Sequence, residues 1–103
     1  MANTITNPGF DPKDADESIT LGFDFASLTS AVSAPVVTVT RHAGKPDAAP
    51  EALLSGVPAV AGPRVLQRVT GGVTGTDYLL RCQVDTPDGD RYVLAGVLPV
   101  RSA

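Results

Sequence analysis

The chain has 103 residues, which limits it to a single domain built around one hydrophobic core. It is 43% hydrophobic and 18% charged, has no tryptophan, and is dominated by valine, alanine, threonine and glycine. Such a composition suits short β-strands joined by turns better than it suits helices.

The formal net charge of −3 comes entirely from residues 1–17, which hold four carboxylates and one lysine. Residues 18–103 hold seven acidic and seven basic residues and are neutral. Domains that bind nucleic acid carry a basic face, so we expect no nucleic-acid partner. The sequence has no apolar run of membrane-spanning length and no basic-then-apolar signal segment, so we also expect no membrane association, and assembly in the cytoplasm.

Residues 1–17 lack periodicity, contain two prolines and end in clustered acids, so we expect an extended acidic N-terminal arm. Two interpretations stay open: a frayed terminus, or an arm that becomes ordered on a partner. In the second case Ile5 and Phe10 are the apolar anchors. The candidate partner-binding residues of the arm are Ile5, Phe10, Lys13, Asp14, Asp16 and Glu17.

Alternating apolar residues predict strands over 18–25, 36–42, 64–70, 76–85 and 90–100. Pro35 has no N–H, so it belongs at the beginning of a strand or at a sheet edge. The single cysteine, Cys82, excludes an intrachain disulfide, and we expect a buried hydrophobe there, not a nucleophile. The side chains expected to face the core are Ile19, Leu21, Phe23, Phe25, Val65, Gln67, Val69, Tyr78, Leu80, Cys82, Val84, Tyr92, Leu94, Leu98 and Val100.

The segment 43–63 is the least regular part of the sequence, and its four prolines exclude a long helix. We expect a Pro/Gly-rich loop, in which residues 51–55 form either one helical turn or a short edge strand. A loop of this kind is a variable insertion or a contact surface for a neighbour. Its apolar residues favour packing against something, and the candidate partner-binding residues are Leu53, Leu54, Val57 and Val60.

Two turns frame the strand over 76–85. Gly71, Gly72 and Gly75 precede it, and this turn is not a phosphate loop because no Lys-Ser/Thr pair follows the glycines. Tyr78 then looks like the tyrosine corner of Ig-type sandwiches, in which the phenol bonds to upstream backbone. After the strand, Thr86-Pro87-Asp88-Gly89 predicts a tight turn that closes a hairpin.

No cluster of residues indicates catalysis. The carboxylates lie in the arm, in turns or singly on strands, and no serine has the pattern of a nucleophile elbow. Asp85, Asp88 and Asp90 lack the longer ligand run and final glutamate of an EF-hand, so they are expected to shape a turn. The single histidine, His42, is expected at the surface. We therefore predict a protein with no enzymatic activity, cofactor or metal.

Two sequence runs carry a family resemblance. KDADESITLGFDF has the form Lys-Asp-x-Asp-Glu, a short strand, then Asp-aromatic; GGVTGTDYLLRCQVDTPDGDRY has the form Gly-Gly-x-x-Gly-x-x-Tyr, alternating apolar residues, then Thr-x-x-Gly. In this order, over 13–25 and 64–100, they resemble the small fibre–tail adaptor-like proteins of tailed bacteriophages. The matching positions are Lys13, Asp14, Asp16, Glu17, Asp24, Phe25 (where tryptophan is usual), Gly71, Gly72, Gly75, Tyr78, Thr86 and Gly89.

Together, strand pattern and resemblance imply an all-β, Ig-like or fibronectin-like antiparallel sandwich of six or seven strands over 18–103, preceded by the arm at 1–17. The resemblance also implies a non-enzymatic virion structural protein, present as a homo-oligomer or multi-copy ring at the neck or tail-fibre attachment region. Its partners are then other virion proteins and further copies of itself. A capsid decoration protein is the alternative, and a carbohydrate- or host-binding module is a weaker one.

Overall fold

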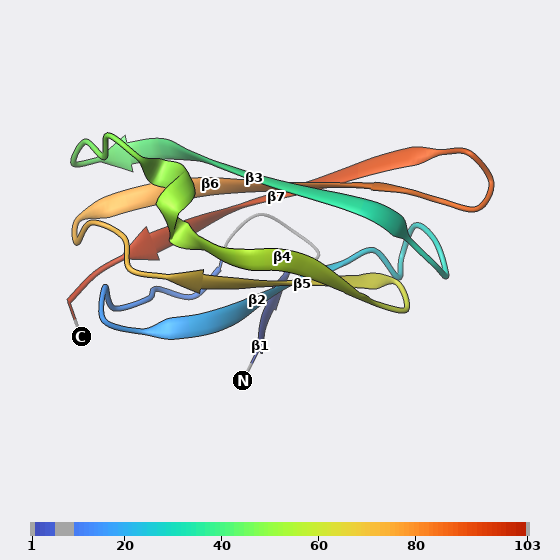
Figure 1. The fold of residues 1–103 in the computed structure, drawn as a ribbon, viewed down its shortest axis with the longest axis horizontal. Coiled ribbons are helices and arrows are strands. Elements are labelled where there is room, and N and C mark those ends of the chain that lie inside the picture. The colour runs from blue at the N-terminus through green and yellow to red at the C-terminus, as the bar shows by residue number, and fades with distance from the viewer. Residues whose placement is uncertain (1, 6–9, 103) are drawn as a thin grey trace.

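The computed structural model describes residues 2–5 and 10–102, and this part of the chain is all-β (Figure 1). None of its helices is long and apolar enough to cross a membrane. The elements are β1 (Ala2–Ile5), β2 (Ser18–Asp24), β3 (Ser33–Gly44), the 3-10 helix η1 (Pro50–Leu53), β4 (Leu54–Ala61), β5 (Arg64–Thr70), β6 (Thr76–Asp85) and β7 (Arg91–Val100).

The strands form two stacked sheets, one with the order β1-β2-β5-β4 and the other with the order β3-β6-β7 (Figure 1). All pairs are antiparallel except β1 with β2, which run parallel and place Ile5 opposite Phe23. This arrangement confirms the predicted β-sandwich. The sheet edges are β1, β4, β3 and β7, and a partner can reach backbone hydrogen-bonding groups at such edges.

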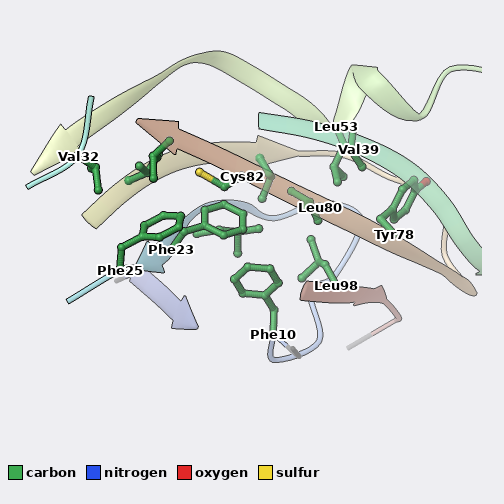
Figure 2. Close-up of a cluster of buried hydrophobic side chains, with 14 of the residues drawn as sticks. Phe10, Phe23, Phe25, Val32, Val39, Leu53, Tyr78, Leu80, Cys82 and Leu98 are labelled. Carbon is green, nitrogen blue, oxygen red and sulfur yellow. The ribbon is translucent and has the colours of Figure 1, made fainter. Parts of the chain in front are cut away.

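The core lies between the sheets and follows the predicted two-residue period (Figure 2). The expected inward residues of β2, β5 and β6 are buried apart from the partly buried Ile19, whereas Tyr92 and Leu94 of β7 are also only partly buried. Gln67 is tolerated in the core because its amide nitrogen donates to the carbonyl oxygens of Gly56 at 3.1 Å and Arg68 at 2.8 Å.

The predicted hairpin joins β6 to β7 in unbroken register from Thr76 opposite Val100 to Asp85 opposite Arg91. In its turn, the N–H of Gly89 donates to the Thr86 carbonyl at 3.0 Å, and Gly89 has φ +87°. A positive φ of this size is accessible to glycine at little cost. The hairpin and its turn are therefore confirmed.

The prediction of a Pro/Gly-rich loop over 43–63 is wrong for most of its length. Strand β3 extends to Gly44, Pro50 begins η1, and residues 54–61 form β4. Both options for residues 51–55 are realised, because the helical turn leads directly into the strand. Pro58 fits in β4 because the pairing with β5 is irregular between Ser55 and Ala59, so no regular ladder position needs its missing N–H.

Candidate partner-binding surfaces

The part of the arm nearest the body pairs with the outer edge of β7. The N–H of Phe10 donates to the Val97 carbonyl and that of Lys13 to the Pro99 carbonyl, both at 2.9 Å. The N–H of Arg101 returns a bond of 2.8 Å to the Lys13 carbonyl. Residues 10–13 thus act as a short parallel strand at the edge of the second sheet, whereas β1 joins the first.

Phe10 belongs to the protein's own core, which corrects its expected role as an anchor for a partner. It is 6% exposed, and its ring meets that of Phe23 edge-on, with centroids 5.5 Å apart (Figure 2). The physical reason is that the arm follows the β7 edge and brings the ring between the two sheets. For Ile5, the other expected anchor, the structure gives the backbone position in β1 only.

Lys13 is also inside the protein, at 1% exposure, so its expected place in a partner-binding surface is wrong. Its ammonium group donates to the carbonyl oxygens of Gly71 at 2.6 Å and Asp14 at 2.8 Å. Burial lowers the pKa of Lys13 from 10.5, and the nearby carboxylates of Glu17, Asp14 and Asp16 oppose that shift. Lys13 thereby ties the arm to the glycine turn.

We expect Lys13→Met to lower the free energy of unfolding by about 1–2 kcal/mol, because two carbonyls lose a donor while relief of a buried charge offsets part of the loss. The unfolded chain holds the Lys13 proton more tightly, so wild-type stability relative to the variant rises as the pH approaches 10.5. Urea denaturation at several pH values measures both effects. The exposed Lys45→Met is the control, and equal effects of the two variants would contradict the buried role.

The acidic residues after Lys13 shape a turn. The Glu17 carboxylate accepts from the Asp14 N–H at 2.7 Å, and the Asp14 carboxylate accepts from the Asp16 N–H at 2.8 Å. The Asp16 and Glu17 side chains are exposed and Asp14 is half-buried. These three predicted partner-binding residues therefore present negative charge at the surface while holding the backbone of the turn.

The apolar residues of η1 and β4 divide into two groups. Leu53 is 2% exposed and belongs to the core, so its prediction as a partner-binding residue is wrong, and Leu54 is half-buried. Val57 is 88% exposed and Val60 is 45% exposed. Of the four, only these two leave large apolar surface on β4, because Leu53 at the end of η1 belongs to the core and Leu54 packs partly against it.

Tyr78 holds the end of the sandwich that contains the glycine turn. Its hydroxyl accepts from the Val73 N–H at 2.8 Å, which confirms the predicted bond to upstream backbone. It also donates to the Asp47 carboxylate at 2.6 Å. This bond and the one from the Ala49 N–H lower the pKa of Asp47 from 3.8. Sequence reasoning missed Asp47, since it lies 31 residues upstream in the irregular segment.

The surroundings of Gly72 require a glycine at this position of the turn. It has φ +97°, and a Cβ there would lie 3.0 Å from Val100 Cγ2 and 3.2 Å from Leu53 Cδ1. Both the backbone conformation and the space exclude a larger residue without strain. The turn is therefore a packing feature, which agrees with the rejection of a phosphate loop.

Three other motif positions also hold connections in place. Asp24 accepts from the Ala26 N–H at 2.9 Å, and buried Phe25 donates its N–H to the Pro63 carbonyl at 2.9 Å. The Thr86 hydroxyl accepts from the Asp90 N–H at 3.1 Å. These residues stabilise turns between strands; they do not form a concave site.

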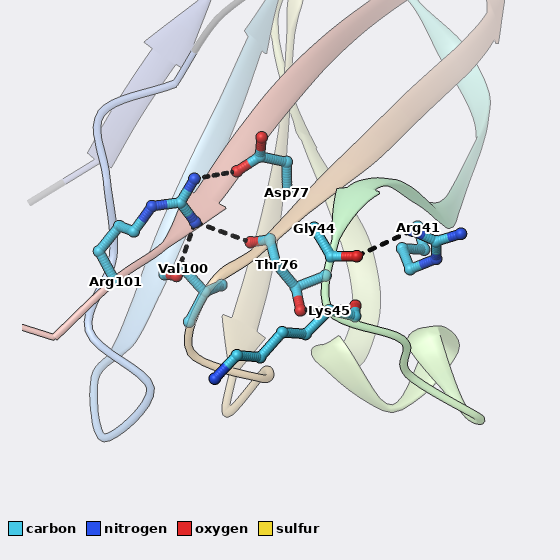
Figure 3. Close-up of polar contacts among 7 residues, drawn as sticks. All are labelled: Arg41, Gly44, Lys45, Thr76, Asp77, Val100 and Arg101. Carbon is cyan, nitrogen blue, oxygen red and sulfur yellow. Dashed lines mark hydrogen bonds and ion pairs between the residues drawn. The ribbon is translucent and has the colours of Figure 1, made fainter.

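Arg101 is a structural residue that the sequence did not indicate. Its guanidinium donates to Asp77 Oδ1 at 2.6 Å and to the Val100 and Thr76 carbonyls at 2.9 and 3.3 Å (Figure 3). It therefore joins the end of β7 to the beginning of β6, next to the docked arm. Its place after the last strand gave no periodic signal.

The described residues contain no group of three or more His, Cys, Asp or Glu that could hold a metal ion. The family described as Podophage GP4 fiber-tail adaptor protein gp77 matches residues 13–99. The chain belongs to this family. No curated protein and no solved structure matches it. The fiber-tail adaptor match begins at Lys13, includes the glycine turn and Tyr78, and also spans 43–63, which the resemblance left out.

Cys82 provides a test of the core of this adaptor-family chain. It lies on β6 with 0% exposure, and burial raises the pKa of its thiol to about 12. Because only the thiolate attacks disulfide reagents, we expect no reaction with Ellman's reagent at pH 8 until the protein unfolds. Addition of guanidinium should release one thiol per chain. Rapid labelling of the native protein would contradict the burial of Cys82.

Proposed function

We propose that this chain is a non-enzymatic structural component of a tailed-phage particle, present in several copies where fibres or neck proteins attach to the tail. The family match over residues 13–99 carries the proposal. The structure supports it, since the motif residues serve packing and turns. The surfaces left for contacts are sheet edges, exposed valines and the acidic turn after Lys13.

Locating the protein in purified particles tests this function. Immunogold labelling should place it at the neck or the fibre attachment region, and quantitative mass spectrometry should give about a dozen copies or fewer, as expected for one symmetric assembly per particle. Absence from particles would overturn the proposal. Copies on the order of hundreds, spread over the head, would instead support the capsid decoration alternative.

The placement of the aromatic residues argues against a carbohydrate-binding module. Such a module stacks sugars on exposed aromatic rings, whereas Phe10, Phe23, Phe25 and Tyr78 are buried. Tyr92, the fifth aromatic residue of the chain, is itself half-buried on β7. Binding of the isolated protein to a glycan array would reverse this argument.

A further inference from the structure

We infer that the free edge of β3 pairs with the β3 edge of a second copy of this chain, so that the two three-stranded sheets form one continuous sheet. This inference deepens the proposed function and rests on it only for the presence of several copies. It is carried by a comparison of the four sheet edges, one of which pairs with no further described strand and carries neither proline nor charge in its central part.

Three of the edges are protected in ways that proteins commonly use. Residues 10–13 cover the β7 edge from Val97 to Val100 by bonding to the Val97 and Pro99 carbonyls, and the rest of that edge begins with the charged Arg91 and contains Gly96. The β4 edge is broken by the irregularity between Ser55 and Ala59 and contains Pro58. β1 has only four residues. These edges are partly covered, interrupted or short, and each is therefore a poorer template for strand addition than a long, regular edge.

The β3 edge differs from them. β3 has 12 residues, and its irregularities lie only toward its ends, between Ser33 and Val36 and between Arg41 and Ala43. From Val36 to Arg41 the register with β6 is regular. This stretch reads VVTVTR, so its first five residues are uncharged and β-branched. It has the β propensity and lack of charge that favour pairing with another strand.

The Val36–Arg41 stretch can pair in antiparallel register with the same stretch of a second copy. Residues opposite each other in an antiparallel pair point to the same face, so a continuous sheet requires even-numbered positions to oppose even-numbered ones. A two-fold axis at Thr38 sets Thr38 against its own equivalent, Val36 against Thr40 and Val37 against Val39 of the second copy. Arg41 then lies opposite Pro35, and no like charges meet. The contact is closed, so it makes pairs of copies.

Three exposed valines lie on β3 or on β4, which contacts it. Val36 is 51% exposed on β3, and Figure 1 shows β4, which carries Val57 and Val60, running below β3 with η1 between them. A strand pair alone gives a small interface. We therefore expect a dissociation constant on the order of micromolar, with these valines adding apolar contact.

The test is the oligomeric state of the full chain by analytical ultracentrifugation. At about 100 μM, well above such a dissociation constant, wild type should sediment with twice the 10.6 kDa of one chain. Thr38 is exposed, so Thr38→Lys and Thr38→Glu should fold, as circular dichroism can verify. Each variant alone should dimerise at least about tenfold more weakly, because like charges face each other. An equimolar mixture of the two should recover the dimer.

Two controls separate the edge from other surfaces. Thr38→Val keeps a β-branched, uncharged edge and should dimerise like wild type. Val93→Lys adds charge to the outer face of the same sheet, on β7, where the side chain is 37% exposed, and should leave the dimer intact. Loss of the dimer in Val93→Lys alone would show face-to-face stacking and overturn the inference.

Two other results would also overturn the pairing: a monomeric wild type, or a Lys/Glu mixture that stays monomeric although both variants fold. A monomer that is nevertheless found in particles would reject the β3 contact and leave the proposed function standing. A β3-paired dimer that is absent from particles would reject the proposed function and leave the β3 contact standing. The two conclusions can therefore fail independently.

Discussion

Replacing Phe10 with alanine should lower the free energy of unfolding by about 3–5 kcal/mol, the range observed when a buried phenylalanine is truncated. The ring is 6% exposed and packs edge-on against Phe23. Truncation removes this contact and leaves a cavity between the sheets that backbone bonds of residues 10–13 to β7 prevent from collapsing fully. The thermal midpoint of the isolated protein should therefore fall by more than ten degrees or so.

This experiment also decides between the two descriptions of the arm. An arm that orders only on a partner predicts no change in the isolated protein when Phe10 is truncated. The matched control is Leu28→Ala, which removes an apolar side chain that is 47% exposed and should cost less than about 1 kcal/mol. Equal effects of the two variants would show that residues 10–13 are not docked on the body in solution.

The strands and the core could be predicted because their signal is local. In β5 and β6 every second side chain is buried, and this period can be read from the residues themselves. Tyr78 was predictable for a similar reason, since the Val73 N–H that it binds lies five residues away. Pro35 correctly indicated a strand near a sheet edge, because it stands close to the start of β3.

The missed features depend on contacts between distant parts of the chain. Lys13 binds the Gly71 carbonyl 58 residues away, and a lysine is rarely buried. Phe10 is buried because the arm lies beside β7, which follows it by about 80 residues along the chain. Nothing local marks either residue as internal. A short arm with prolines and acids has the composition of a free tail, so composition alone favoured a partner-binding role.

The free β3 edge was missed for a related reason. The run VVTVT predicted a strand, and the sequence does not state which strands lie at the edges of a sheet. β4 was hidden by Gly56 and Pro58, so the order β1-β2-β5-β4 could not be assembled. From the sequence alone, the uncharged run from Ser33 to Thr40 indicates only a strand. Once the strand order shows that β3 lies at a sheet edge, the same run indicates an edge that can pair with another chain.

Removing one oxygen atom with Tyr78→Phe should lower the free energy of unfolding by about 2–4 kcal/mol. The Val73 N–H loses its acceptor and the Asp47 carboxylate loses its donor, while the ring keeps its packing. The ring is 0% exposed, so water cannot readily replace the hydroxyl. Tyr92→Phe is the matched control, because in the described part of the chain the half-buried Tyr92 makes no hydrogen bond through its hydroxyl.

The pH dependence of this loss identifies the role of Asp47. Its pKa is below 3.8 in the folded protein, first because Tyr78 donates to it and second because the Ala49 N–H does. A lowered carboxylate pKa stabilises the fold above the unfolded value and loses that effect as the pH falls through the folded value. The gap between wild type and Tyr78→Phe should therefore narrow below about pH 4. Asp47→Asn should remove the acid dependence and keep the bond to Val73. A gap that stays constant from neutral pH into acid would show that Asp47 contributes nothing through its charge, and that the Val73 bond alone accounts for the stability supplied by Tyr78.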